Sequence, residues 1–173
     1  MPSVVFMRGV NVGGHKAFKP SELAGRLASL EVKSLGAAGT FVVRADASAV
    51  DVRRQFLSHI PFETELMICS GKDLAGLVAL RPFEGKAVPK SDGQFVSVLG
   101  KPPGSAPKLP LEVPAGKDWQ VRIIAVHRIF VVSLMRRVGT KLLYPNEVVE
   151  RQLGVPATTR NWSTIMKIHE ALC

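Results

Sequence analysis

The chain has 173 residues, of which 46% are hydrophobic and 21% charged, and this balance excludes an extensively disordered protein. A net charge of +9 favours anionic partners such as nucleotides, phosphorylated metabolites or nucleic acid. The basic excess is uneven, because residues 1–86 carry a net charge of +3 and residues 87–173 carry +6.

No apolar stretch reaches the roughly 18–20 residues that a membrane span needs, so no membrane partner is expected. The first eight residues lack a basic leader and a small-residue cleavage site, and they are expected to form a strand. Cys69, Cys173 and the four histidines lack metal-ligand spacing, so neither a metal nor a cofactor is predicted. These observations predict a reduced, cytoplasmic protein.

The first eighty residues show a β-α-β-β-α-β pattern. Pro20 suits the first position of a helix, and Ser48 or Asp46 can cap a second helix that Pro61 ends. Strands are predicted over residues 3–8, 32–37, 40–43 and 65–69. This order predicts an α+β fold in which residues 1–80 form a ferredoxin-like lobe.

Residues 92–173 are predicted to form a second, smaller α+β lobe, with the two lobes forming either separate units or one compact unit. Ser70 can cap a short helix before this region, and five prolines between Gly100 and Gly116 predict an exposed loop. The remaining predicted elements are a strand over 94–99, a hairpin over 121–134, a helix from 145 to 154 and a last helix that carries Trp162, Ile165 and Met166 on one face.

A glycine-rich segment, Arg8-Gly9-Val10-Asn11-Val12-Gly13-Gly14, follows the first predicted strand. It has the G-x4-G spacing of a phosphate loop, but His15 and Lys16 stand where that motif needs Lys and Ser or Thr. The amides of Gly13 and Gly14 could still form an anion-binding concavity with Arg8, Asn11 and Lys16 nearby. The alternative is a simple turn that needs positive φ angles.

A second segment, Ala157-Thr158-Thr159-Arg160-Asn161-Trp162, precedes the last predicted helix. Thr158 or Thr159 is expected to be the N-cap, which would place Arg160 in the first turn at a cost of roughly 0.3–1 kcal/mol. An anion bound there by amides, a Thr hydroxyl, Arg160 and Asn161 would offset this cost. Alternatively, Arg160 pairs with Glu147 or Glu150 and joins two helices.

Three further candidates carry weaker signals. The basic stretch from Arg136 to Lys141 is expected to be a solvated turn, with a contribution to an anion site as the alternative. Cys69 ends a predicted strand, but no base that would activate it as a nucleophile is identifiable. Trp162 and His169 have helical spacing on an apolar face and are expected in the core.

Both segments resemble a bacterial family known as the domain-of-unknown-function family number sixteen ninety-seven. In that family a strand ends in R-G-I-N-V-G-G, which the segment from Arg8 to Gly14 resembles, and a C-terminal T-T-R-N-W-N-T is similar to residues 158–164 of this chain. Gly139-Thr140-Lys141-Leu142 also resembles a segment of the family. Where the family usually has Q-S-G-N, this chain has Ala37-Ala38-Gly39-Thr40. The resemblance implies an α+β, ferredoxin-like fold and a cytosolic bacterial protein, and it implies no established activity.

The leading functional hypothesis is a binding protein for a phosphate-bearing or other anionic small ligand, held in one pocket by both segments. The predicted site consists of Arg8, Asn11, Gly13, Gly14, Lys16, Thr158, Thr159, Arg160 and Asn161. The alternatives are nucleic-acid binding by the basic second half, a purely structural role, and an enzyme that uses His15, Lys16 or Lys141 as acid or base. No residue pair identifies a reaction class.

Overall fold

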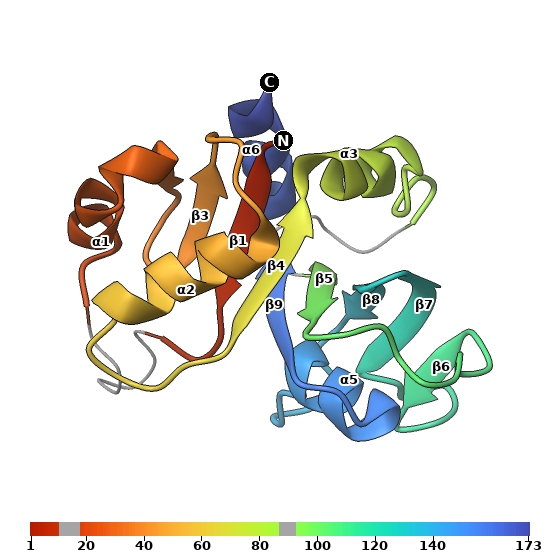
Figure 1. Ribbon diagram of the computed structural model, residues 1–173. Helices are drawn as coiled ribbons and strands as arrows, with labels where there is room; N and C mark the ends of the chain where they lie inside the picture. Colours follow the sequence, from red (N-terminus) through yellow and green to blue (C-terminus); the bar gives the residue numbers. More distant parts are fainter. Residues whose placement is uncertain (11–17, 87–92) are drawn as a thin grey trace. The chain divides into compact units, whose positions relative to one another are not determined.

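The computed structural model describes residues 1–10, 18–86 and 93–173 and divides into two compact units (Figure 1). Unit 1 comprises Met1–Gly76 and Lys167–Cys173, and unit 2 comprises Leu77–Met166. Each unit contains an antiparallel sheet. The combination of helices with two antiparallel sheets confirms the predicted α+β fold class.

The sheet of unit 1 has the ferredoxin-like strand order β2-β3-β1-β4. It is formed by β1 (Ser3–Met7), β2 (Val32–Ser34), β3 (Thr40–Val43) and β4 (Leu66–Ser70), and every neighbouring pair is antiparallel. Helix α1 (Pro20–Arg26) and the short 3-10 helix η1 (Ala28–Leu30) connect β1 to β2, and α2 (Ala49–His59) connects β3 to β4. The β-α-β-β-α-β prediction is confirmed.

Both helices pack on one face of this sheet (Figure 1). The alternating residues Val5 and Met7 of β1 lie in one core cluster with Leu23 of α1 and Phe56 of α2. The Phe56 ring meets Phe41 of β3 edge-on at a centroid distance of 5.2 Å. The core therefore holds the end of β1, where the glycine-rich segment begins, in a defined position.

Local capping signals define the helix starts of unit 1. The Ser48 side chain accepts a hydrogen bond of 3.1 Å from the amide of Asp51, and Pro20 is the first residue of α1. The Ser70 hydroxyl accepts one of 3.0 Å from the amide of Asp73 at the start of α3 (Gly71–Ala79). The predicted strand over 32–37 is shorter than expected, because the chain turns through Gly36 and Gly39, both with positive φ.

The sheet of unit 2 has the order β6-β7-β8-β5-β9. It is formed by β5 (Gln94–Leu99), β6 (Leu111–Val113), β7 (Val121–His127), β8 (Phe130–Met135) and β9 (Ala157–Asn161). Helix α5 (Pro145–Leu153) packs against this sheet through Val148 and Val149 and ends at Gly154, whose φ of 64° closes the helix. The predicted hairpin and this helix are confirmed.

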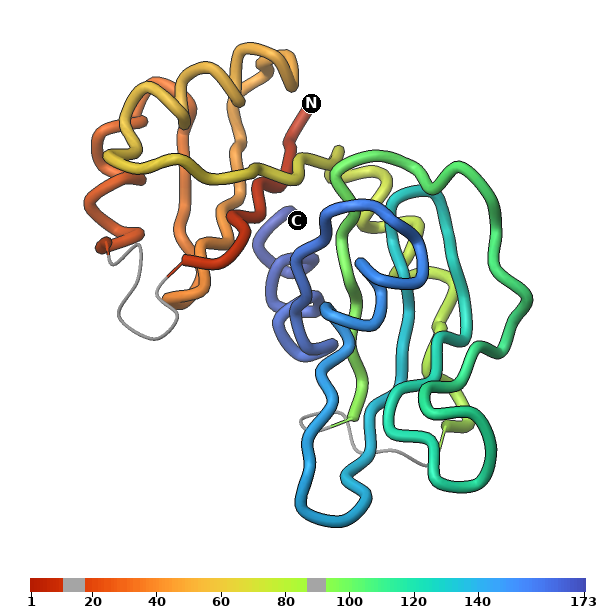
Figure 2. Tube along the Cα trace, turned by 90° about the horizontal axis from the view of Figure 1, so that it is seen from below, coloured from red at the N-terminus to blue at the C-terminus, as the bar shows by residue number. Residues whose placement is uncertain are grey.

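The proline-rich stretch contains a strand that the sequence reading missed. The chain from Gly100 runs along the outside of unit 2 (Figure 2) and then pairs three residues, Leu111–Val113, with β7. The prediction of a continuous exposed loop was therefore wrong for these residues. Pro110 and Pro114 flank the strand, and its position at the sheet edge leaves one side without a ladder partner, where proline is tolerated.

The segment from Ala157 to Asn161 is also a strand, where a helix cap and first turn were predicted. It forms β9 and pairs antiparallel with β5, so that Arg160 lies opposite Val96 and Thr159 opposite Ser97. Helix α6 (Trp162–Leu172) begins only at Trp162. Two adjacent β-branched threonines favour the extended conformation once a partner strand is available.

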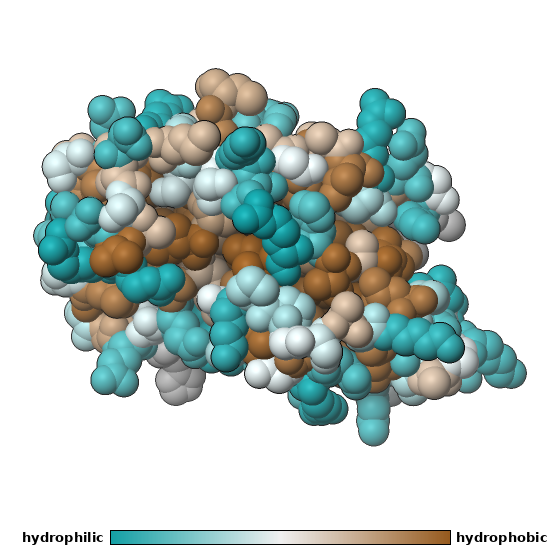
Figure 3. Space-filling model, turned by 45° about the vertical axis from the view of Figure 1, so that its right-hand side comes forward, coloured by the Kyte–Doolittle hydropathy of each residue, from teal (hydrophilic) through white to brown (hydrophobic). Residues whose placement is uncertain are grey.

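Apolar side chains are not confined to the core. The face in Figure 3 shows apolar side chains among hydrophilic ones, and Leu57, Leu80 and Tyr144 are among the exposed large hydrophobic residues. Scattered exposure of this kind is normal for globular proteins. None of the helices in the described residues has the length and hydropathy that crossing a membrane requires.

Candidate functional site

The structure places five of the nine predicted site residues. Arg8 lies in unit 1 directly after β1, and Thr158, Thr159, Arg160 and Asn161 belong to unit 2. Asn11, Gly13, Gly14 and Lys16 lie outside the described residues, as does His15. The described residues of the two predicted segments thus belong to different units.

Arg160 is a buried strand residue rather than a residue of a helix start. Its side chain is 8% exposed, and Nη1 donates hydrogen bonds of 2.7 Å to Thr158 Oγ1 and 3.0 Å to the carbonyl oxygen of Thr159. Burial lowers the pKa of Arg160 to about 10, because desolvation disfavours the charged form. The prediction that Arg160 lies in the first turn of the last helix was therefore wrong.

The other polar residues of β9 also hold local structure. The hydroxyl groups of Ser97 and Thr159 lie 2.7 Å apart, and Thr159 donates a hydrogen bond of 2.8 Å to Asn146 Oδ1 on α5. Asn161 Oδ1 accepts a hydrogen bond of 2.9 Å from the amide of Thr164, so the capping interaction expected of Thr158 or Thr159 is made by Asn161. These contacts join β9 to β5, α5 and α6.

The two glutamates considered as partners of Arg160 have defined contacts. Glu147 pairs with Arg151 one turn later on α5, at 3.3 Å. Glu150 Oε1 accepts a hydrogen bond of 2.9 Å from the amide of Ala157 at the start of β9. Glu150 thus links the helix to the strand that carries Arg160.

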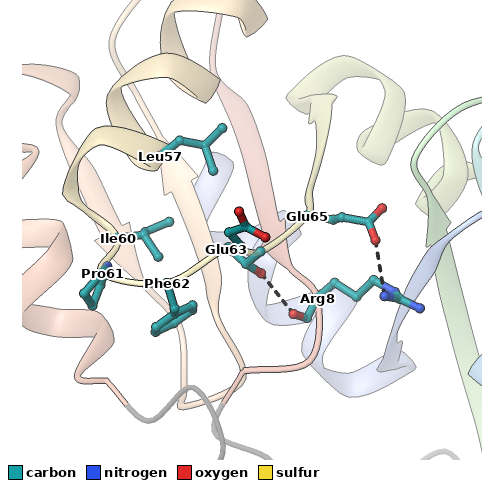
Figure 4. A pocket seen from close by; sticks show the side chains of 8 residues that line it. Arg8, Leu57, Ile60, Pro61, Phe62, Glu63 and Glu65 are labelled. Carbon is teal, nitrogen blue, oxygen red and sulfur yellow. Dashed lines mark hydrogen bonds and ion pairs between the residues drawn. The ribbon is translucent and has the colours of Figure 1, made fainter.

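Arg8 borders a large cavity in unit 1 (Figure 4). The cavity has a volume of about 800 Å³, within the range of small-molecule sites. Apart from Arg8, its described lining comes from the end of α2 and the segment that leads into β4. These residues are Leu57, Ile60, Pro61, Phe62, Glu63, Thr64 and Glu65.

The backbone of Arg8 is held from both sides by this same segment. Its amide donates a hydrogen bond of 3.1 Å to the carbonyl oxygen of Glu65, and its carbonyl oxygen accepts one of 3.1 Å from Thr64 Oγ1. Gly9 follows with a φ of 65°, which redirects the chain immediately after Arg8. The guanidinium group therefore extends from a fixed point at the cavity.

The Arg8 side chain remains accessible at this point. It is 38% exposed, and Nη1 lies 3.2 Å from Glu65 Oε1, whose side chain is 52% exposed, in an ion pair (Figure 4). Ion pairs of this kind contribute about 0.2–1 kcal/mol, because water and salt screen them. A ligand anion that binds the guanidinium in two-point geometry could therefore replace Glu65.

The rest of the cavity lining is apolar on one side. Ile60 is buried and Phe62 is half-buried, and the Phe62 ring meets Phe18 edge-on at a centroid distance of 5.8 Å. Pro61 ends α2 and directs the chain along this wall. The sequence reading missed residues 60–65 as a lining, since no motif marks them beyond the helix-ending proline and the acidic pair before β4.

The basic stretch after the hairpin has a structural role at its first residue. Arg136 Nε donates a hydrogen bond of 2.6 Å to the carbonyl oxygen of Trp119, and Arg136 also donates to the carbonyl oxygen of Lys117. The guanidinium groups of Arg122 and Arg136 lie 4.1 and 4.0 Å from the centroid of the Trp119 ring. For Arg136, the prediction of a solvated turn was wrong.

Cys69 has the environment of an unreactive thiol. It is buried on β4, and burial, together with a smaller effect from the charge of Asp73, raises its pKa from 9.0 to about 12. At neutral pH a thiol with this pKa is almost entirely protonated. The environment of Cys69 therefore argues against a role for this residue as a nucleophile. Across residues 1–10, 18–86 and 93–173, no group of three metal-ligating side chains occurs.

The raised pKa of Cys69 predicts a loss of stability in alkali. Between pH 9 and 12 the unfolded chain loses the thiol proton while the folded chain keeps it, so the free energy of unfolding should fall by about 1.4 kcal/mol per pH unit. Urea unfolding from pH 8 to 10.5 would measure this slope. In Cys69→Ala the slope should be smaller by this amount, and equal slopes in the two proteins would contradict the assignment.

Comparisons with known proteins place the fold and the family. The conserved bacterial protein SP0830 from Streptococcus pneumoniae, a solved structure, is similar to this chain with a TM-score of 0.64 and 19% sequence identity. The match covers 99% of this chain and 98% of that protein. A comparison with curated proteins found no match. The family model described as "Protein of unknown function (DUF1697)" matches residues 1–126, and the chain therefore belongs to this family.

Proposed function

We propose that the protein binds a small ligand with a phosphate or other anionic group at the Arg8 cavity of unit 1. One observation carries the proposal: a partly exposed arginine, whose backbone is held by two hydrogen bonds, lines a cavity of about 800 Å³. Arginine suits this role because its planar group binds phosphate or carboxylate through two parallel hydrogen bonds.

The lining also indicates what the rest of the ligand is like. Ile60, Pro61 and Phe62 provide an apolar wall in the same cavity, on the side away from the Arg8 guanidinium (Figure 4), which favours a ligand with an apolar or aromatic body. Asn11, Gly13, Gly14 and Lys16 follow Arg8 in the chain and remain part of the proposal on sequence grounds alone. The residues of β9 are not part of it, because their side chains hold the fold of unit 2.

The two carboxylates at the cavity make the proposal specific. Glu65 competes with a ligand anion for Arg8, and Glu63 adds a second negative charge to the lining. Glu65→Gln should therefore strengthen anion binding, since it removes both the competing carboxylate and its repulsion. Arg8→Gln should weaken binding at least about tenfold, because it removes at least one charge-assisted hydrogen bond to the ligand.

A thermal-shift titration of the full chain with inorganic phosphate and phenyl phosphate tests the proposal. At one hundred times the dissociation constant a ligand adds about 2.7 kcal/mol to the free energy of unfolding. Phenyl phosphate should bind more tightly than phosphate, because its ring can contact the apolar wall. Arg54→Gln is the matched control, since Arg54 is an exposed arginine of the same unit in an ion pair with Asp51.

Three outcomes would overturn the proposal. The first is no stabilisation by either compound, and the second is equal stabilisation of wild type and Arg8→Gln. The third is weaker binding in Glu65→Gln, which would indicate that Glu65 receives a cationic group of a different ligand. A short duplex DNA serves as a further arm, because stabilisation that falls steeply with salt and persists in Arg8→Gln would favour nucleic-acid binding instead.

A further inference from the structure

A second cavity, entirely within unit 2, has a different chemical character. It has a volume of about 330 Å³ and is lined by Val78, Phe83, Gln94, Trp162 and Met166. The cavity is open to solvent, so a ligand can reach its apolar lining. Its volume is at the lower end of the range of ligand sites and fits one or two rings.

Two aromatic side chains form a rigid wall of this cavity. Phe83 and Trp162 are each 7% exposed, and their rings meet edge-on at a centroid distance of 5.1 Å and an angle of 65°. Met166 lies one turn after Trp162 on α6 and adds an adaptable thioether surface. Such walls favour an aromatic ligand over a flexible aliphatic one, since flat rings stack or meet edge-on with little loss of conformational freedom.

The polar groups of the lining indicate an uncharged ligand. Arg81 and Glu84 also line the cavity, but they pair with each other at 3.3 Å and are largely exposed, so they add no net charge. Gln94 is 4% exposed at the first position of β5, where its backbone is held opposite Leu134 of β8. The side-chain carbonyl oxygen of this amide, Oε1, is buried and can accept a hydrogen bond from a ligand in the cavity.

We propose that this cavity is a second, separate binding site, for a small uncharged aromatic molecule with a hydrogen-bonding group that pairs with the Gln94 amide. The proposal does not depend on the Arg8 cavity, because the two sites share no residue. The apolar walls supply affinity, and Gln94 selects ligands that carry a polar group in the plane of the ring.

Benzamide and toluene are suitable probes, since both have one benzene ring and only benzamide can pair with an amide. The chain has two tryptophans, Trp119 and Trp162, whose indole N–H signals in a ¹H–¹⁵N spectrum of the full chain can be assigned with Trp119→Phe. Benzamide should shift the Trp162 signal saturably and leave that of Trp119 in place. Benzoate should not produce this shift, because its charge would be buried.

Substitutions in the lining, with one control outside it, separate the parts of the proposal. Gln94→Leu should weaken benzamide binding about tenfold and leave toluene binding within about twofold of wild type. Val78→Phe should fill the cavity and abolish binding of both probes, and Met166→Phe serves the same purpose if Val78→Phe does not fold. Arg151→Ala, at a side chain of unit 2 that is 68% exposed on α5 and outside the lining, should bind both probes as wild type does.

The proposal would be overturned by the absence of a saturable Trp162 shift up to the solubility limit of benzamide. It would also be overturned if the filled variants retained binding, or if Gln94→Leu weakened benzamide and toluene equally. Phosphate and phenyl phosphate titrations read out the other site, so failure at one site is distinguishable from failure at the other.

Discussion

Replacing Gly39 with alanine is expected to lower the free energy of unfolding by about 2–5 kcal/mol. Gly39 has a φ of 75°, and a Cβ atom there would lie 2.7 Å from Val10 Cγ2 and 2.8 Å from Met7 Cβ. Met7 Cβ is attached to the backbone of a central strand and cannot move away without distorting β1. Strain and steric overlap therefore add in this variant.

Gly36→Ala is the matched control for this prediction. Gly36 has a nearly equal φ of 72° in the same connection, but a Cβ there would have no atom within 4 Å. It should lose only the strain of a left-handed conformation, about 1–2 kcal/mol. Urea unfolding of both variants at pH 7 measures the difference, and equal losses would show that the close approach of Gly39 to β1 costs nothing.

The Gly39 turn also bears on the proposed function. The Gly39 carbonyl oxygen accepts a hydrogen bond of 2.7 Å from the amide of Met7, one residue before Arg8. A shift of this turn would move the end of β1 and with it the guanidinium at the cavity. If phosphate binds through Arg8, Gly39→Ala should therefore weaken it even at temperatures where the variant is folded.

The second large effect is expected from Arg160→Ala, which should lower the free energy of unfolding by about 2–4 kcal/mol. The change removes a buried side chain and its hydrogen bonds to Thr158 Oγ1 and the carbonyl oxygen of Thr159. Much of the loss comes from packing, because an arginine stem buries several methylene groups. Urea unfolding at pH 7 would measure it.

Two further variants identify the origin of this loss. Arg160→Met keeps most of the side-chain volume without the donors or the charge, so it should lose less than Arg160→Ala. Arg151→Ala, at a side chain 68% exposed on α5, should change stability by less than about 0.5 kcal/mol. An Arg160→Ala protein as stable as wild type that no longer binds phosphate would reverse our assignment and return Arg160 to the binding site.

Much of the fold could be predicted because its signals are local. Ser48, Ser70 and the pair of Pro145 and Gly154 mark helix ends through contacts within a few residues. Short continuous apolar runs identify β1 and β3 in the same way. The ferredoxin-like strand order then follows from the order of helices and strands, since few topologies join such a series without crossing.

The candidate site was only half visible in the sequence. Arg8 stood out by its place before the glycines, but the cavity wall comes from residues 60–65, and Thr64 Oγ1 meets the Arg8 carbonyl across 56 positions of the chain. The cavity of unit 2 likewise combines Phe83 with Trp162, which are far apart in sequence. No periodicity or motif encodes such contacts, because they form only when separate elements pack together.

By itself the sequence determined the α+β class, the ferredoxin-like unit and most helix boundaries, since these depend on neighbouring residues. The tertiary structure decided that Thr158, Thr159 and Arg160 form a strand, because the pairing of Thr159 with Ser97 spans 62 positions and outweighs the local preference for a helix cap. It also decided that Arg160 is buried while Arg8 stays accessible. Two arginines in similar sequence surroundings thereby acquired opposite roles, one in packing and the other at a cavity.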